Sequence, residues 1–203
     1  KINREMEGFS TEEEIDEAIG KIESSVEYLS TTIDDFRNFF KPNKETAVFD
    51  IGKVIEKTIK LTSAQFTARE ITIIKDIEST QLESYENELI QVLMNILNNA
   101  RDALENKKYD KFIFITTSKE DDKLMIKIKD NAGGIPIDII EKIFEPYFTT
   151  KEESKGTGIG LYMSEEIITK HMKGTLTVQN SEYSYENKNY TGACFIIELK
   201  INS

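Results

Sequence analysis

The chain has 203 residues, 38% of them hydrophobic and 31% charged, a composition typical of a soluble globular domain with an appendage. Its net charge of −11 argues against nucleic acid as a partner, because phosphate binding needs clustered Lys and Arg. No apolar run approaches the roughly 20 residues of a membrane span, and the single Cys194 excludes an intrachain disulfide and suits a reducing, cytoplasmic compartment.

The chain begins with Lys rather than Met and carries no signal peptide. We therefore expect a fragment of a longer protein, whose upstream part could hold a membrane segment. No membrane contact is expected within the fragment itself.

Residues 10–40 are predicted to form one long helix. Ser10 with Glu13 fits a capping box, and Pro42 marks the far end. Apolar residues recur at alternating steps of four and three, the heptad period of a coiled coil, at Ile15, Ile19, Ile22, Val26, Leu29, Ile33 and Phe36. The strict period favours pairing with a partner helix; packing on the chain's own domain is the alternative. We expect residues 1–44 and 45–203 to be separate parts.

From residue 45 onward the pattern alternates between strands and helices. Strands are predicted at 47–51, 70–77, 174–180 and 192–201, helices at 51–65, 85–106 and 158–172, and a hairpin at 111–130. Residues 131–157 are predicted to be a long loop, and residues 180–191 a polar link. The predicted fold class is α+β: a two-layer α/β sandwich with a mixed, mainly antiparallel sheet and three helices on one face, preceded by the long coiled-coil-like helix.

The helix at 85–106 carries a second stripe beside its apolar one. Asn95, Asn99 and Asp102 lie four and seven positions apart and so share a face. Asn is a mediocre helix former that prefers caps and turns. Its repeated use in the middle of a helix therefore needs a reason beyond local structure.

Two glycine-rich segments flank an aromatic one. Asp130 ends a strand before Gly133 and Gly134, which can take positive φ; taken alone, this is most simply a strand-ending turn. Further on, "GTGIG" offers backbone N–H groups to phosphate just before a helix, although it is no Walker loop. Between them, "IFEPYFTTK" is expected to expose Phe144 and Phe148 on a mobile lid over residues 131–156.

Together these segments resemble the GHKL family of ATP-binding domains (gyrase, Hsp90, histidine kinase, MutL), and most closely the sensor histidine kinases of two-component systems. "NILNNA" is similar to the N box, "DNAGG" to the first glycine box, "IFEPYFTTK" to the F box and "GTGIGL" to the second glycine box. "STTIDDFRNFFKP" resembles the second helix of the dimerisation and phosphotransfer hairpin. Two residues depart from the family pattern: Ala132 replaces a usual Gly, and Ala193 stands where many relatives carry Thr.

The resemblance implies a Bergerat-type fold and a role for each motif. Asn99 would supply its amide oxygen to Mg²⁺ on the ATP phosphates, with Asn95 one turn earlier, and Asp130 would accept the adenine amino proton. The nucleotide site would comprise Asn95, Asn99, Asp102, Asp130, Gly134, Ile135, Phe144, Phe148, Lys151, Gly156, Thr157, Gly158, Ile159, Gly160 and Leu161.

The resemblance also implies transfer of the ATP γ-phosphate to a His outside this fragment, for relay to a response regulator Asp. The implied partners are ATP with Mg²⁺, the His-bearing helix of the parent protein, the receiver domain of a response regulator, and a second copy through the N-terminal helix. The single His171 lies at the end of a helix and is expected to be structural.

Two other functions are alternatives to this one. A hydrolysing GHKL ATPase or a serine kinase would carry a Glu as general base where this chain has Asn95, an amide that cannot take a proton. This favours an already nucleophilic imidazole as the acceptor. A nucleotide-binding scaffold without transfer activity stays open from the sequence.

Overall fold

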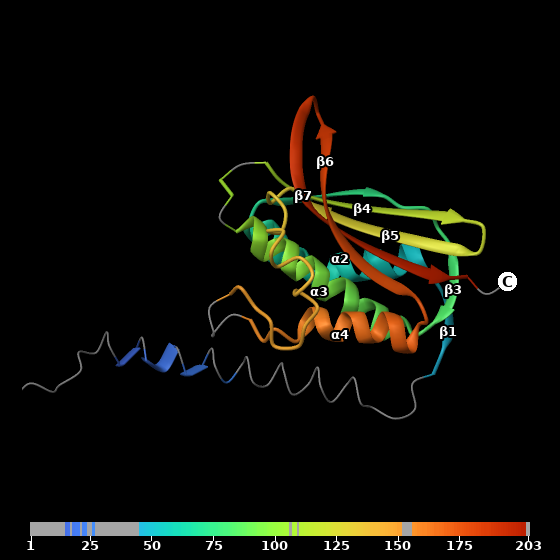
Figure 1. The fold of residues 1–203 in the computed structure, drawn as a ribbon, viewed down its shortest axis with the longest axis horizontal. Coiled ribbons are helices and arrows are strands. Elements are labelled where there is room, and N and C mark those ends of the chain that lie inside the picture. Colours follow the sequence, from blue (N-terminus) through green and yellow to red (C-terminus); the bar gives the residue numbers. More distant parts are fainter. Residues whose placement is uncertain are drawn as a thin grey trace, which may run out of the picture. The chain divides into compact units, whose positions relative to one another are not determined.

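The computed structural model describes residues 15–16, 18–20, 22–23, 26, 45–105, 107–108, 110–151 and 156–201. The chain divides into two compact units, Lys1–Lys41 with Thr149–Thr157, and Pro42–Phe148 with Gly158–Ser203. The second unit contains every strand described here (Figure 1). No helix in the described part of the chain is long and apolar enough to cross a membrane.

Most of the helix predicted at 10–40 falls outside the described residues. The positions that are described within it are helical. Four of the predicted seam residues are among them, and they are 48% to 63% exposed: Ile15, Ile19, Ile22 and Val26. Leu29, Ile33 and Phe36 lie outside the described residues, so the seam as a whole stays a prediction.

A five-stranded sheet forms one layer of the second unit. Its strand order is β2 (Ile71–Asp76), β4 (Lys111–Glu120), β5 (Lys123–Asp130), β7 (Lys188–Lys200) and β6 (Thr175–Tyr185). Only the β2–β4 pair is parallel, and the other three pairs are antiparallel. The predicted mixed, mainly antiparallel sheet is therefore confirmed.

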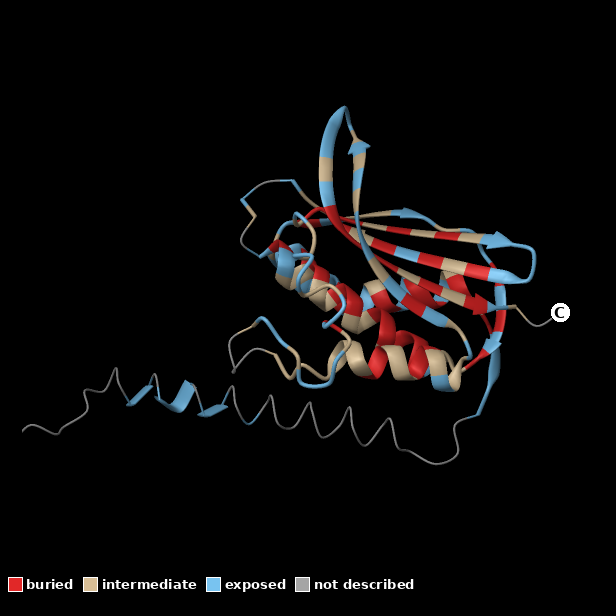
Figure 2. Cartoon of the chain, in the orientation of Figure 1, coloured by how far each residue is buried: buried red, intermediate tan, exposed pale blue. Residues whose placement is uncertain are grey.

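Three helices form the second layer, on one face of this sheet: α2 (Ile51–Ala68), α3 (Glu86–Leu104) and α4 (Gly160–Glu166) (Figure 1). A π-helical turn, η1 (Ile167–His171), continues α4. Figure 2 shows the buried residues on the facing sides of the two layers, as the apolar stripe of α3 and the alternation along β4 require. The predicted two-layer sandwich is confirmed.

A second, two-stranded sheet was not predicted. β1 (Ala47–Asp50) pairs antiparallel with β3 (Gln81–Ser84) rather than joining the main sheet. β3 has four residues and a single apolar side chain, Leu82, so it offers too little alternation to be recognised. The Asp50 side chain then caps α2 by accepting a hydrogen bond from the Lys53 N–H at 2.9 Å.

The predicted polar link at 180–191 is wrong. β6 continues to Tyr185 and β7 begins at Lys188, joined by Glu186 and Asn187 at φ of 48° and 61°. Positive φ at both central residues is the geometry of a type I′ hairpin turn. The alternation of Tyr183 and Tyr185 was the signal that the prediction overlooked.

These tyrosines lie against β4. The ring of Tyr183 is 5.1 Å from that of Phe114, and the ring of Tyr185 is 5.3 Å from that of Phe112, measured between centroids. The aromatic contacts explain why a stretch with so many polar residues is ordered as a strand. In Figure 1 the β6–β7 hairpin extends beyond the ends of the other strands.

Candidate functional site

Asn95 faces the start of α4. Its Nδ2 donates to the carbonyl oxygen of Gly160 and to Oγ of Ser164, each at 3.3 Å. Ser164 is fully buried and also donates to the Gly160 oxygen, at 2.9 Å. The amide therefore ties the middle of α3 to the helix that follows the second glycine box. Direct contact of Asn95 with phosphate stays a prediction.

The next two residues of the same stripe differ in their surroundings. Asn99 is half-buried one turn further along α3. Asp102 forms an ion pair with Arg101, whose Nη2 lies 2.6 Å from its Oδ1. Arg101 also donates to Oδ1 of Asn98 at 3.0 Å, so Asn98, given no role from the sequence, helps to hold this arginine. The ligand contacts of Asn99 and Asp102 stay predictions.

Asp130 is a buried carboxylate, 3% exposed, at the end of β5. Its Oδ1 accepts hydrogen bonds from the N–H groups of Ala132 at 2.8 Å and Ala193 at 3.2 Å. Burial raises the pKa of Asp130 above its ordinary value, while these N–H groups and Lys107 act in the opposite direction. Within the described part of the chain no group donates to Oδ2, which leaves this oxygen for a ligand.

The two departures from the family pattern leave this arrangement intact. Ala132 and Ala193 contribute only backbone N–H groups to the carboxylate, so the identity of their side chains does not decide the contact. Gly192, next to Ala193, is decisive in another way: a Cβ there would lie 1.7 Å from the carbonyl oxygen of Asp130. The approach of β7 to Asp130 requires glycine at this position.

The turn after Asp130 is held by a residue that the sequence reasoning missed. Asn131 is buried, and its Oδ1 accepts from the Phe112 N–H at 2.9 Å. Its carbonyl accepts from Nζ of Lys107 at 2.7 Å. Gly133 and Gly134 follow at φ of 102° and 90°, which confirms the predicted positive φ. An Asn after a strand resembles any turn residue, so no local pattern indicates this role.

The F box and the second glycine box meet through their backbones. The Tyr147 N–H donates to the Gly158 carbonyl at 3.0 Å. A Cβ on Gly158, whose φ is 65°, would lie 2.4 Å from the carbonyl carbon of Tyr147. Glycine is required here both by this close approach and by the positive φ.

The prediction that Phe144 and Phe148 are exposed is wrong, because both are half-buried. The Phe148 N–H donates to the Glu145 carbonyl at 3.2 Å, which closes a turn with Pro146 and Tyr147 at its tip. The tip residue Tyr147 is therefore the aromatic side chain that faces solvent, 75% exposed.

The remaining predicted site residues fall in three places. Ile159, Gly160 and Leu161 start α4, and Gly134 and Ile135 start the loop after β5; all are half-buried. Lys151, Gly156 and Thr157 belong to the first unit, where the Lys151 N–H donates to Oγ1 of Thr149 at 3.1 Å. Their part in a nucleotide site stays a prediction.

His171 ends the π-helical turn. Its Nδ1 lies 2.9 and 3.0 Å from the two carboxylate oxygens of Glu88, near the start of α3. Its ring also packs edge-on against Tyr85, with 6.3 Å between centroids. These contacts join the end of one helix to the start of another and agree with the predicted structural role.

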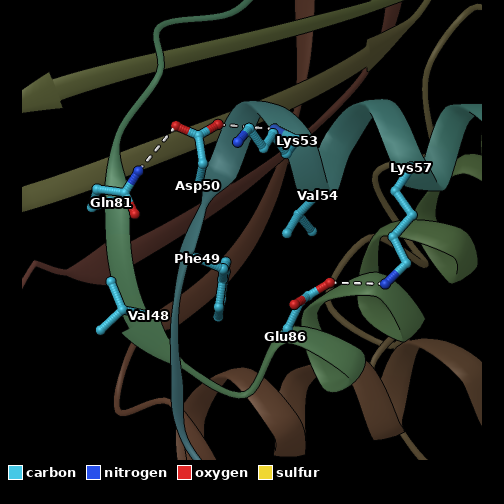
Figure 3. A pocket seen from close by; sticks show the side chains of 8 residues that line it. All are labelled: Val48, Phe49, Asp50, Lys53, Val54, Lys57, Gln81 and Glu86. Carbon is cyan, nitrogen blue, oxygen red and sulfur yellow. Dashed lines mark hydrogen bonds and ion pairs between the residues drawn. The ribbon is translucent and has the colours of Figure 1, made fainter.

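A side pocket of about 340 Å³ lies at the two-stranded sheet and the first turns of α2 (Figure 3). Its lining residues are Val48, Phe49, Asp50, Lys53, Val54, Lys57, Gln81 and Glu86. Asp50 is held by Gln81, and Lys57 by Glu86 at 2.8 Å. None of the predicted nucleotide-site residues lines this pocket.

Comparison with known proteins points to one group. Residues 84–203 match the model of the histidine kinase-, DNA gyrase B- and HSP90-like ATPase family. Sensor histidine kinase ZraS of Escherichia coli O157:H7 is 31% identical over 177 residues, which cover 86% of this chain and 36% of that protein. Histidine-protein kinase AtoS of Escherichia coli K12 is 27% identical over 189 residues, 92% of this chain and 29% of that protein.

Solved structures similar to this chain are also histidine kinases. The nucleotide-free catalytic domain of histidine kinase ThkA is 28% identical with a TM-score of 0.65, over 77% of this chain and 96% of that domain. ThkA in complex with the response regulator TrrA has a TM-score of 0.73 at 23% identity, over 96% of this chain and 53% of that one, which shows likeness of fold. In eight curated relatives, ZraS and AtoS included, the match covers between 12% and 36% of the relative's length.

Proposed function

Because this chain belongs to the histidine kinase-, DNA gyrase B- and HSP90-like ATPase family, we propose that it is the ATP-binding catalytic part of a sensor histidine kinase. The observation that carries this proposal is the Asp130 carboxylate, which is buried, fixed through Oδ1 and able to accept a proton donor through Oδ2. The two curated relatives given above are named as a sensor histidine kinase and a signal transduction histidine-protein kinase, which supports the same function.

Asp130 would read the base. A carboxylate oxygen accepts the amino hydrogen of adenine, whereas the carbonyl of guanine at the same place would meet it oxygen to oxygen. In a buried site this difference is larger than in water, because an unpaired polar group cannot turn to solvent. We therefore expect ATP to be preferred to GTP.

The residues present fit a magnesium–phosphate group. Mg²⁺ prefers oxygen ligands and is usually held by one or two protein groups together with phosphates and waters. Asn99 offers an amide oxygen on the half-buried face of α3, one turn from the amide that contacts Gly160. The metal would neutralise phosphate charge, and the backbone N–H groups of Gly158 to Leu161 would hold the phosphates.

The absence of a base at Asn95 favours transfer over hydrolysis. Its amide donates to Gly160 and Ser164 and cannot accept a proton at neutral pH. A neutral imidazole needs no such base: its nitrogen attacks the γ-phosphorus while the bond to the β–γ bridging oxygen breaks, and ADP leaves with that electron pair. This argues against a hydrolysing ATPase or a serine kinase.

The acceptor would be a His in a helix of the parent protein, because the chain has no histidine other than His171. The exposed apolar residues at 15, 19, 22 and 26 support a seam through which residues 1–44 would dimerise, apart from a catalytic part at 45–203. A response regulator would then take the phosphoryl group. We expect the whole process to be cytoplasmic.

The proposal is tested first by calorimetry. The chain should bind MgATP, bind ATP more weakly without Mg²⁺, and prefer ATP to GTP. Equal affinity for both nucleotides, or none for either, would overturn the assignment of the base site.

Transfer is tested with radiolabelled ATP and a separate polypeptide that carries the missing His helix. Acid-labile label should appear on the added helix, at a rate limited by docking. Binding of MgATP without any transfer to this helix would indicate a nucleotide-binding scaffold instead.

A further inference from the structure

Asn180 on β6 binds both backbone groups of a residue far from it in sequence. Its Oδ1 accepts from the Ile135 N–H at 2.7 Å, and its Nδ2 donates to the Ile135 carbonyl at 2.7 Å. A carboxamide used in this way replaces the backbone of a neighbouring strand. Ile135 is the residue at which the loop after β5 leaves the glycine turn.

The residue paired with Asn180 in the β6–β7 hairpin contacts the other end of the glycine turn, at Asp130. Asn180 is the cross-strand partner of Ala193, whose N–H donates to Oδ1 of Asp130 at 3.2 Å. Between them, the Gly133 N–H donates to the Thr191 carbonyl at 2.9 Å. The hairpin therefore contacts the turn at its beginning, middle and end.

Gly134 makes room for this contact. A Cβ there would lie 2.6 Å from Oδ1 and 2.8 Å from Cγ of Asn180. Its φ of 90° also lies in the region that favours glycine. The close approach of the carboxamide and the lack of a side chain at Gly134 therefore depend on each other.

We propose that Asn180 is a positioning residue of the nucleotide site, which fixes the backbone at Ile135 and so holds the Asp130 turn and the root of the loop in one arrangement. That the ligand of this site is a nucleotide rests on the proposed function. Asn180 itself need not touch the nucleotide, because it acts through Ile135 and Gly134.

The first test needs no nucleotide. Hydrogen exchange of the Ile135 N–H is compared in the wild type, in Asn180→Ala and in the control Asn189→Ala. Asn189 lies on the same hairpin, is exposed and accepts one hydrogen bond, from Ser184 Oγ at 2.6 Å. Loss of one or two hydrogen bonds predicts exchange about 5- to 30-fold faster at Ile135 in Asn180→Ala alone.

A substitution that merely loosens the fold would also speed exchange in the core. The amide of Ile126, in the middle of β5, serves as the reference and should not change. Asn180→Asp keeps the acceptor for the Ile135 N–H but loses the donor to its carbonyl, and should give an intermediate rate. Equal exchange at Ile135 in wild type and Asn180→Ala would overturn the proposal, whatever the chain binds.

The second test measures MgATP affinity by calorimetry. Asn180→Ala should weaken binding by about 5- to 30-fold, because the turn must be ordered when the ligand binds. Asn189→Ala should bind like the wild type. Faster exchange at Ile135 with unchanged affinity would show that the contact does not position the site, and failure of the wild type to bind would contradict the proposed function alone.

Discussion

The carboxylate of Asp130 lies where its charge is unfavourable. It is buried at the end of β5, and burial raises its pKa above the ordinary value even though two N–H groups bind Oδ1. An amide in the same place would keep the acceptor oxygen and lose the charge. If Asp130 binds the nucleotide as proposed, it would stabilise the ligand at the expense of the free fold, which is common at functional sites.

Asp130→Asn should therefore weaken ATP binding and stabilise the free chain. The amide would point a donor at the adenine amino group, and we expect affinity to fall about tenfold to a hundredfold, with the preference over GTP reduced. Calorimetry and thermal unfolding give the two readouts. An unchanged preference for ATP in the variant would show that Asp130 does not read the base.

The effect of Asp130→Asn on the free energy of unfolding should depend on pH. Because the pKa of Asp130 is raised by folding, the folded chain binds more protons than the unfolded one between the ordinary and the raised value. The contribution of this group to stability therefore falls as pH rises through that window. The stability advantage of Asp130→Asn should be largest at neutral pH and shrink as the solution is acidified.

Asn99 can be tested against a neighbour of the same type. Asn99→Ala should lower Mg²⁺-dependent ATP affinity, because the metal would lose its protein oxygen, by about tenfold to a hundredfold. Asn98→Ala is the matched control, since Asn98 contacts Arg101 instead. Calorimetry with and without Mg²⁺ separates the two, and equal MgATP affinity in wild type and Asn99→Ala would contradict the assignment.

At the scale of elements, the contact between Tyr147 and Gly158 joins the F box to the second glycine box, eleven positions further along the chain. Gly158→Ala should reduce the free energy of unfolding by about 1–3 kcal/mol, because its Cβ would meet the Tyr147 backbone at 2.4 Å. Gly133→Ala is a useful control, since Gly133 also has positive φ but has nothing within 4 Å of the added Cβ. A larger loss of stability in Gly133→Ala than in Gly158→Ala would contradict the steric explanation.

The loop after β5 is expected to act as a lid. Between residues 131 and 151 it has turns and no regular helix or strand. Its backbone contacts the rest of the domain at Ile135 and Tyr147, whereas the backbone hydrogen bonds between residues 136 and 145 are local to the turns. We expect its amides from about 136 to 146 to exchange rapidly in the free chain and more slowly with MgATP bound. Equal protection with and without nucleotide in hydrogen exchange would exclude a lid.

At the scale of the whole molecule, the chain should bind MgATP without phosphorylating itself. His171 is held by both oxygens of Glu88 and packs on Tyr85, so it has a structural partner. His171→Ala should therefore lower thermal stability and leave nucleotide affinity unchanged. Acid-labile label on the chain alone, absent from His171→Ala, would overturn both the structural role of His171 and the external acceptor.

Local patterns along the chain are enough to predict most of the fold and to identify the motifs. Helical and strand periods are local, so α2, α3 and the β4–β5 hairpin follow from the order of apolar residues. The positive φ at Gly133 and Gly134 was also expected, because few other residues adopt it. The local pattern was too weak to predict a strand where the strand was short, as in β3, or where its apolar face was built from tyrosines, as in β6.

How the motifs are held depends on contacts between residues that are far apart along the chain. The bonds from Asn95 to Gly160 and from Asn180 to Ile135 join residues 65 and 45 positions apart. The same holds for Ala193 with Asp130, 63 positions apart. Such pairs are set by strand register and helix packing. An Asn that fits a turn or cap in isolation acquires its role only when the sheet brings a distant backbone within hydrogen-bonding distance.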